Sequence, residues 1–352
     1  MYRFQTPNPN QLNGLNLVNA SLAKNGVLLP PHTIDIHPVS GRCNLDCQWC
    51  IGRKGRSSVK PLPQYITSET IVALLEKALL PEEFPLWPST FHFCGGDSEP
   101  LLNPGAVIKG TAFLLEKERI VRLVTNGLAL NKPGIAPIVA EMHRLNVSLD
   151  VVDDDQFQTF KRPGAGIRYG YQRVLANLER VADLKARRAT MLIISVSFVA
   201  TSATFEDTAW KRCFEQLRDL GVALITVRQD LSGVFGEIYR LKERIDSIAE
   251  HVPGVEIKYI APEVPCAESD FEFCRGPMLW PTLAADGNLY ACAHVATSRY
   301  RPFANLATAS SLMACYRELR DSRSRGFRDV RQIGCERQCP TTIGRFNAAS
   351  IG

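Results

Sequence analysis

In the first two-thirds of the chain, segments with the apolar spacing of strands alternate with segments that have the apolar spacing of helices. Short apolar or alternating runs predict six strands, at 33–39, 89–94, 120–125, 146–151, 191–200 and 223–228. Helical spacing predicts helices between them, at 68–79, 103–117, 133–143, 171–186 and 205–220. Strands that alternate with helices and are apolar on both faces indicate βαβ units and a parallel sheet. The strands are too few for a closed eight-stranded barrel.

The remaining parts of the chain differ in pattern and predict three regions. Residues 1–30 lack periodicity and are expected to be an irregular segment before an α/β domain at 31–262. A bridging stretch after the sixth strand holds a helix and a short strand at 255–260. From 263 to 352 the helical pattern weakens and six cysteines follow, which indicates a small separate domain. There, Asp286-Gly287 between two apolar runs predicts a β-hairpin.

Composition and charge narrow the class of protein. The chain has 352 residues, 45% of them apolar and 22% charged, with a net charge of +5. This balance is typical of a globular protein and is far from a nucleic-acid-binding footprint. No secretory signal and no long apolar stretch is present, so a cytoplasmic protein without membrane or nucleic-acid partners is expected. In that compartment the eleven cysteines are expected to be metal ligands or thiols rather than disulfides.

Three of the cysteines lie close together directly after the first predicted strand. Cys43, Cys47 and Cys50 have the spacing C-x3-C-x2-C on a predicted loop. Three thiolates leave a tetrahedral zinc one ligand short, although a structural zinc loop remains the alternative. A [4Fe–4S] cluster held by three cysteines has one iron open to another ligand. The triplet therefore indicates reactive chemistry.

At 41–52, GRCNLDCQWCIG, the sequence resembles the radical S-adenosylmethionine (SAM) superfamily, whose signature is this triplet. The resemblance implies that the open iron binds the amino and carboxylate groups of SAM. One electron, from a donor such as flavodoxin or ferredoxin, then cleaves SAM to a 5′-deoxyadenosyl radical. The fold implied is α/β, a partial (β/α)6 barrel, which agrees with the strand and helix pattern.

Turns after the other predicted strands add to this resemblance. The sequence CGGDSEPLLNP from Cys94 onward is similar to the family's GGEP turn, with Asp97 and Ser98 inserted before the glutamate. Active-site residues of parallel α/β folds lie at the carboxyl ends of strands. The residues that the resemblance implies for SAM binding are Trp49, Gly95, Gly96, Glu99, Thr125, Asn126, Asp150 and Arg168.

A second set of cysteines lies in the C-terminal region. It resembles the auxiliary-cluster domains called SPASM and twitch, and has the four ligands of the shorter twitch form: Cys274, Cys292, Cys335 and Cys339. The resemblance implies a second, auxiliary [4Fe–4S] cluster without an open iron, suited to electron transfer. A structural zinc site is the alternative, because four cysteines suit either metal.

Three further residues are candidates for catalysis. Cys94 and Cys266 are either small core residues or thiols that donate a hydrogen atom to a substrate radical. Arg228, at the end of the sixth strand, either contacts an anionic or hydroxylated substrate or forms a surface ion pair.

Size and cysteine layout resemble those of twitch-domain dehydrogenases acting on aminocyclitols or sugars. The expected activity is therefore that of an oxidoreductase of antibiotic biosynthesis, in which hydrogen abstraction oxidises an alcohol of a sugar, aminocyclitol or nucleoside. The alternatives are a sugar epimerase, a decarboxylase or lyase acting on a sugar-acid nucleoside, a SPASM-type peptide maturase, and a metal-binding scaffold without catalysis.

Overall fold

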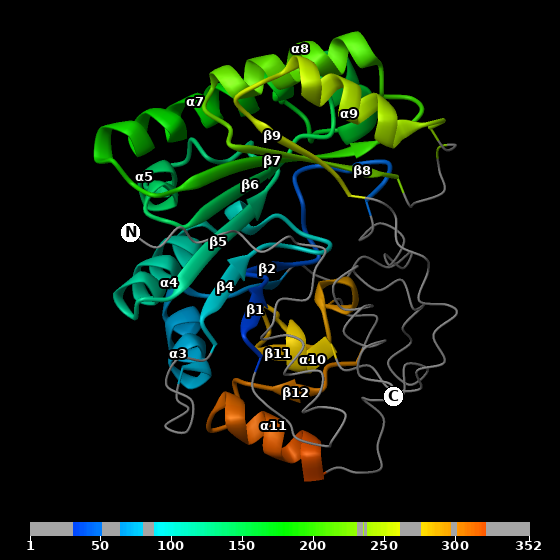
Figure 1. The fold of residues 1–352 in the computed structure, drawn as a ribbon. Coiled ribbons are helices and arrows are strands. Elements are labelled where there is room, and N and C mark those ends of the chain that lie inside the picture. Colours follow the sequence, from blue (N-terminus) through cyan, green and yellow to red (C-terminus); the bar gives the residue numbers. More distant parts are fainter. Residues whose placement is uncertain are drawn as a thin grey trace. The chain divides into compact units, whose positions relative to one another are not determined.

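The computed structural model describes residues 31–50, 64–79, 88–230, 235, 238–260, 276–296 and 301–321. For residues 318–321 it describes the backbone only. The chain divides into two compact units, whose helices and strands are labelled in Figure 1. The larger unit consists of His37–Val72 and Phe91–Pro262. The smaller unit consists of Met1–Ile36, Ala73–Thr90 and Glu263–Gly352. Within the described ranges no helix is long and apolar enough to cross a bilayer.

The larger unit is built on a sheet whose strands follow the chain order. The order is β4 (Thr90–Phe93), β5 (Ile120–Thr125), β6 (Arg144–Ser148), β7 (Ile193–Ala200), β8 (Leu224–Gln229) and β9 (Glu256–Ile260). From β5 to β9 every neighbouring pair is parallel. The predicted α/β fold with a parallel sheet is therefore confirmed, and the bridging strand extends the sheet as β9.

Helices connect these strands and cover one face of the sheet. They are α4 (Pro104–Glu116), α5 (Ile135–Ala140), α7 (Gly170–Arg188), α8 (Asp207–Asp219) and α9 (Leu241–His251). On β7 the ring of Phe198 lies 5.0 Å from Trp210 and 5.2 Å from Phe214, both on α8. All three side chains are fully buried, so burial of apolar area holds helix and sheet together.

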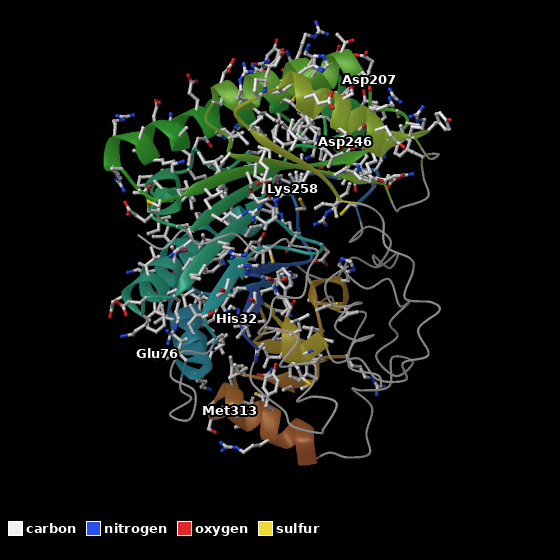
Figure 2. All side chains as sticks on the ribbon, viewed as in Figure 1. His32, Glu76, Asp207, Asp246, Lys258 and Met313 are labelled. Atoms are coloured by element: carbon white, nitrogen blue, oxygen red, sulfur yellow. The ribbon has the colours of Figure 1, made fainter. Side chains whose placement is uncertain are left out.

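The opposite face of the same strands is polar. Asn146 Nδ2 donates to Ser197 Oγ at 3.1 Å, and Arg144 Nε donates to Ser195 Oγ at 3.1 Å. Lys258, labelled in Figure 2, lies on β9 opposite Thr226 of β8. The prediction that each strand is apolar on both faces is thus wrong for this side. A sheet that curves into a barrel can direct polar side chains toward a ligand on its inner face.

The strands of the smaller unit follow each other in the order β12 (Ala304–Asn305), β11 (Asn288–Tyr290), β10 (Thr282–Leu283) and β1 (Thr33–Ile36). The predicted hairpin is present as antiparallel β10 and β11. Gly287 in its turn has φ 80°, a conformation that favours glycine. Lys77, in the second half of α3 (Ser68–Ala78), donates to the Ala307 carbonyl at 2.7 Å. The unit also includes α10 (Gly276–Leu279) and α11 (Leu312–Asp321).

The first predicted strand is broken in the structure. β1 ends at Ile36, and β2 (Val39–Ser40) pairs instead with β3 (Gln64–Tyr65). Pro38 lies between them and has no N–H to donate to a neighbouring strand, while its carbonyl accepts from Ile66 N at 3.2 Å.

Candidate functional site

The cysteine loop lies in the larger unit and is held by the segment after β6. Asp46 N donates to the Lys161 carbonyl and Gln48 N to the Phe160 carbonyl, each at 3.0 Å. Within the loop, Leu45 N donates to the Cys43 thiol at 3.4 Å. Two separate stretches of sequence therefore determine the shape of the loop.

The chemistry of the three thiols suits an iron–sulfur cluster. Cys43, Cys47 and Cys50 are half-buried and close enough for their charges to interact. Burial raises the pKa of Cys43 and of Cys47 to about 12, so both are protonated at neutral pH until a metal displaces the proton. Among the residues described here, no three Cys, His, Asp or Glu side chains are placed to hold one metal ion. Three neighbouring thiols can each hold one iron of a cubane cluster.

The glycine turn after β4 packs against the start of the cysteine loop. Ser98 Oγ donates to the Val39 carbonyl at 2.6 Å, and Asp97 Oδ1 accepts from Gly41 N at 3.2 Å. A Cβ on Gly95 would lie 2.2 Å from the carbonyl oxygen of Ser98, so only glycine fits there. The two inserted residues, Asp97 and Ser98, thus connect the turn to the cysteine loop.

Glu99 connects the same turn to the end of β5. Its carboxylate is buried and accepts from Thr125 Oγ1 at 2.6 Å, Asn126 N at 2.9 Å and Leu101 N at 3.1 Å. Burial raises the pKa of Glu99, and these three hydrogen bonds work against the rise. Its carboxylate therefore has three protein partners in the structure.

Asn126 then connects β5 to the cysteine loop itself. Its Nδ2 donates to Asn44 Oδ1 at 2.7 Å and lies 3.9 Å from the Cys43 thiol. Its Oδ1 accepts from Leu128 N at 3.1 Å, which fixes the direction of the side chain. The turns after β4 and β5 thus meet the cysteine loop, as the strand-end argument predicted.

Asp150 ends β6 in the left-handed region, with φ 61°. β6 therefore ends at Ser148, three residues before the predicted end of the strand at residue 151. Asp150 Oδ1 accepts from Val199 N at 2.9 Å, and Oδ2 accepts from Lys161 Nζ at 3.0 Å. Sequence reasoning missed Lys161, because its segment has no apolar periodicity that marks it as buried.

The other predicted SAM-site residues have these surroundings. The Trp49 ring is buried and lies 6.3 Å from both Phe160 and Phe235. Arg168 is exposed just before α7, and its carbonyl accepts from Gln158 Nε2 at 2.8 Å. Gly96 is half-buried in the turn after β4. The roles of all the predicted SAM-binding residues stay predictions.

The candidate catalytic residues are placed differently from one another. Cys94 is buried at the end of β4. Arg228 near the end of β8 is exposed to solvent, yet enough protein surrounds it that desolvation lowers its pKa. Cys266 lies outside the described residues.

Of the second cysteine set, only Cys292 can be described. It is buried after β11 in the smaller unit, where it precedes a single 3-10 turn, Ala293–Val295. Cys274, Cys335 and Cys339 lie outside the described residues, so the auxiliary site stays a prediction.

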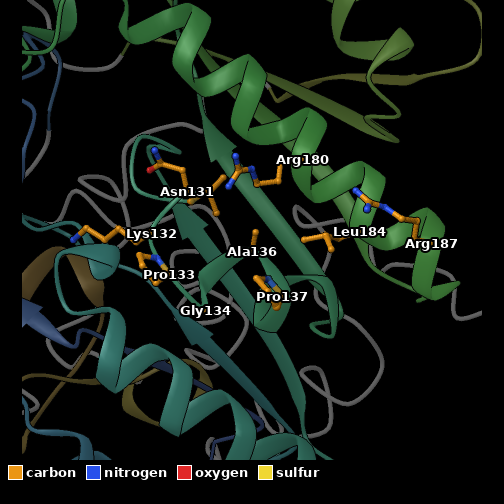
Figure 3. A pocket seen from close by; sticks show the side chains of 10 residues that line it. Asn131, Lys132, Pro133, Gly134, Ala136, Pro137, Arg180, Leu184 and Arg187 are labelled. Atoms are coloured by element: carbon orange, nitrogen blue, oxygen red, sulfur yellow. The ribbon is translucent and has the colours of Figure 1, made fainter.

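A hollow seen in Figure 3 lies elsewhere in the larger unit. It is bordered by the segment after β5 and by α7, with Lys132, Arg180 and Arg187 among its lining residues. None of the predicted site residues lines it. Lys132 Nζ is already bonded to the Leu101 carbonyl at 2.9 Å.

A parallel α/β sheet whose strand-end turns meet a C-x3-C-x2-C loop defines a radical SAM fold. Solved structures agree. Streptococcus suis SuiB bound to S-adenosylmethionine has a TM-score of 0.61 at 15% identity, covering 92% of this chain and 76% of that one. The structure titled "Native anSMEcpe with bound AdoMet" has a TM-score of 0.56 at 15% identity, covering 83% and 82%. At these identities the likeness shows the fold.

Residues 37–210, just under half of the chain, match the Radical SAM superfamily. S-adenosylmethionine and a [4Fe–4S] cluster, the cofactors predicted from the sequence, are those that this superfamily uses. The prediction of a radical SAM enzyme is confirmed at the level of the superfamily.

Curated relatives correct the expected reaction. A GTP 3′,8-cyclase from Streptomyces coelicolor is 35% identical over 125 residues, which are 35% of each chain. A GTP 3′,8-cyclase from Corynebacterium glutamicum (strain R) is 29% identical over 181 residues, or 46% of each chain. The chain thus spans between a third and a half of the length of these relatives. The prediction of an alcohol-oxidising sugar enzyme is wrong, because the relatives are named for a cyclisation of GTP.

Proposed function

We propose that this chain is a radical SAM enzyme that acts on a purine nucleotide, with GTP the first substrate to test. The observation that carries this proposal is the common name of its curated relatives, GTP 3′,8-cyclase, which denotes bond formation between positions 3′ and 8 of GTP. The proposed enzyme class is accordingly a cyclase, and the small-molecule substrate is an anionic nucleotide.

The polar face of the sheet supports an anionic substrate. Arg144 and Lys258 lie on the face opposite the helices, and Arg228 is exposed near the carboxyl end of β8. Guanidinium groups suit phosphate oxygens, because they offer paired donors together with a positive charge. Arg228 is the residue that we propose to contact a phosphate of the nucleotide.

The residues of the cysteine loop have defined roles in this proposal. Cys43, Cys47 and Cys50 would hold the cluster, which with SAM supplies the 5′-deoxyadenosyl radical that abstracts a hydrogen atom. The Glu99 and Asn126 hydrogen bonds hold the neighbouring turns at the loop. Trp49, Gly95, Gly96, Thr125, Asp150 and Arg168 are proposed to contribute to the SAM side of the site. An external electron donor and a second cluster at Cys274, Cys292, Cys335 and Cys339 complete the proposal.

The test is an anaerobic assay of reconstituted protein with SAM, dithionite and GTP. The expected products are 5′-deoxyadenosine and an 8-linked cyclic nucleotide, identified by mass spectrometry. Deuterium placed at C3′ of GTP should appear in the 5′-deoxyadenosine. A variant with Cys43, Cys47 and Cys50 all changed to alanine serves as the control without the cluster.

The outcomes separate the levels of the proposal. If 5′-deoxyadenosine forms but GTP stays unchanged, GTP is not the substrate. If the iron-loaded protein releases no 5′-deoxyadenosine under any condition, the proposed activity fails as a whole. An Arg228→Gln variant that retains the KM for GTP would remove Arg228 from the phosphate site.

A further inference from the structure

The segment 157–169, between β6 and α7, covers one side of the cysteine loop. Asp46 N and Gln48 N, on either side of Cys47, donate to carbonyl groups of this segment at 3.0 Å. Gln48 Nε2 adds a further hydrogen bond, to the Thr159 carbonyl at 3.1 Å. Cys47 is half-buried, as are the other two cysteines of the loop. The backbone of the segment is thus attached directly to the residues around the central cysteine.

The other side of the same segment is exposed to solvent. Arg162, Ala165, Gly166 and Tyr169 are exposed there, and Tyr169 is 72% exposed although its ring is apolar. A Cβ added to Gly166 would meet no atom within 4 Å, so the space above the backbone is open. These four residues are called the outer surface below. On this side, a single stretch of chain therefore separates the cysteine loop from solvent.

The charge of this part of the chain is positive. Between Asp155 and Glu179 the sequence holds no acidic residue and four basic ones, Lys161, Arg162, Arg168 and Arg173. Lys161 is buried, whereas the three arginines are exposed. The acidic residues that precede this stretch belong to a separate short helix, where the Asp153 carboxylate accepts from Gln156 N at 2.7 Å. The exposed side of the segment thus attracts an acidic partner.

Arg162 places one of these charges where the segment is attached to the cysteine loop. Its carbonyl accepts from Asp46 N at 3.2 Å, while its side chain is exposed. Its φ of 46° lies in the left-handed region, in which glycine or asparagine costs less than arginine. Unusual backbone conformations often occur at functional sites. The fold therefore accepts a strained arginine at the point closest in hydrogen bonding to the central cysteine.

We propose that the outer surface is the docking site of the external electron donor, and that this donor is a small acidic flavoprotein of the flavodoxin class. One electron passes from the reduced flavin to the cluster. The flavin is oxidised and the cluster reduced by one electron each, and no bond forms or breaks. The proposal rests on the cluster and the external donor of the proposed function, and it adds the surface at which the two proteins meet.

The outer surface suits such a partner in three ways. Positive charge speeds the association of a protein with an acidic partner. The exposed Tyr169 ring offers an aromatic contact of the kind that is enriched at interfaces. At Gly166 no side chain prevents the planar edge of a flavin from approaching the backbone. Transient complexes of electron-transfer proteins need only a small surface of this kind.

The first experiment measures binding of flavodoxin to the full-length protein by calorimetry at low ionic strength. In the double variant Arg162→Gln, Tyr169→Ala the Kd should rise about tenfold, because it loses a charge and an aromatic contact at the interface. The matched control is Arg187→Gln, Met191→Ala, which changes an exposed arginine at the end of α7 and an exposed apolar residue before β7. These lie at the opposite edge of the sheet, so the control should bind like the wild type.

The second experiment separates docking from the state of the cluster. It follows reduction of the iron-loaded protein by stopped flow, without SAM or GTP. With limiting reduced flavodoxin, the Arg162→Gln, Tyr169→Ala variant should be reduced about tenfold more slowly than the wild type. With dithionite, which is small enough to need no docking surface, the two proteins should be reduced at the same rate.

The outcomes that overturn the proposal are distinct from those that overturn the proposed function. A wild-type Kd in the Arg162→Gln, Tyr169→Ala variant would overturn the docking site, and so would an equal loss of rate with flavodoxin and dithionite. Tighter binding and faster reduction with ferredoxin than with flavodoxin would overturn the flavoprotein as donor. The binding titration needs neither iron nor GTP, so it gives its answer even if the protein converts no GTP.

Discussion

Two side chains, Glu99 and Asn126, account for much of the order at the site. Glu99 accepts three hydrogen bonds from the two turns that follow β4 and β5, and Asn126 continues from the second turn to the cysteine loop. Each buried polar group has partners, as buried polar groups must to avoid a desolvation penalty. Their removal should therefore affect the cysteine loop as well as their own turns.

The raised pKa of Glu99 predicts a pH dependence of stability in the protein without its cluster. The folded state holds the proton to a higher pH than the unfolded state, whose Glu pKa is near 4.5. Folding stability from this group is thus highest below that value and declines as pH rises through the folded pKa. Urea unfolding of Glu99→Gln and wild type across this range should show the variant gaining relative to wild type as pH rises.

Glu116, which is exposed on α4, offers a matched control for that measurement, because Glu116→Gln should follow the wild-type curve. A constant difference between Glu99→Gln and wild type at every pH would contradict the assignment of a raised pKa to Glu99.

Residues at strand ends could be selected from the sequence, but their partners could not. Asn126 and Asp150 follow runs of apolar residues, so their position at the carboxyl edge was predictable. Lys161 was not found, because a lysine in a polar stretch is ordinarily exposed. Its burial depends on carbonyl groups and a carboxylate at the end of β6, which local pattern does not reveal.

At the scale of an element, the turn between β4 and α4 allows a prediction about stability and SAM cleavage. In Gly95→Ala the new methyl carbon would lie 2.2 Å from the Ser98 carbonyl, so the turn must open. We expect a loss of unfolding free energy of about 1–3 kcal/mol, typical of a forced steric clash. SAM cleavage should fall with it, because Ser98 connects the turn to Val39 before the cysteine loop.

Gly164 is the matched control for this substitution. Its added Cβ would lie 3.8 Å from the Asn44 carbonyl oxygen, which is an ordinary van der Waals contact. Thermal unfolding and 5′-deoxyadenosine release should therefore be nearly unchanged in Gly164→Ala. Equal stability and activity of Gly95→Ala and wild type would show that the turn tolerates a side chain.

Helices and strands were predicted well where the pattern is local. β5 matches its predicted bounds, and α7 and α8 differ from theirs by at most two residues at each end. The differences occur where the backbone conformation of a single residue ends a strand. Pro38 interrupts the first strand, and the left-handed conformation of Asp150 shortens β6.

At the scale of the whole molecule, the second cluster gives an iron count that can be measured. If four cysteines of the C-terminal region bind an auxiliary [4Fe–4S] cluster, anaerobic reconstitution should yield about eight irons per chain. Cys292→Ser should reduce the count toward four while SAM still changes the remaining cluster signal. Cys315→Ser is the control, since Cys315 is buried on α11 outside the proposed set. Zinc in the isolated protein, or four irons in both variants and wild type, would contradict the auxiliary cluster.

The wrong prediction of sugar oxidation also concerns the molecule as a whole. The expected sugar oxidation rested on overall size and on the number of C-terminal cysteines, which describe cofactors rather than substrate. The curated relatives match over less than half of the chain and are named for GTP. Substrate choice depends on side chains brought together from several strands. The three cations proposed for an anionic substrate, Arg144, Arg228 and Lys258, have no shared spacing along the sequence.

The sequence by itself determined the parallel α/β fold and the radical SAM site, because βαβ periodicity and the C-x3-C-x2-C spacing are properties of neighbouring residues. Only the tertiary structure decided which turns meet the cysteine loop, that one face of the sheet is polar, and that Lys161 is buried against the end of β6. These features arise from hydrogen bonds and charges between residues far apart in the chain, such as Asn126 with Asn44 and Lys161 with Asp150. Their energies depend on burial, which exists only after folding.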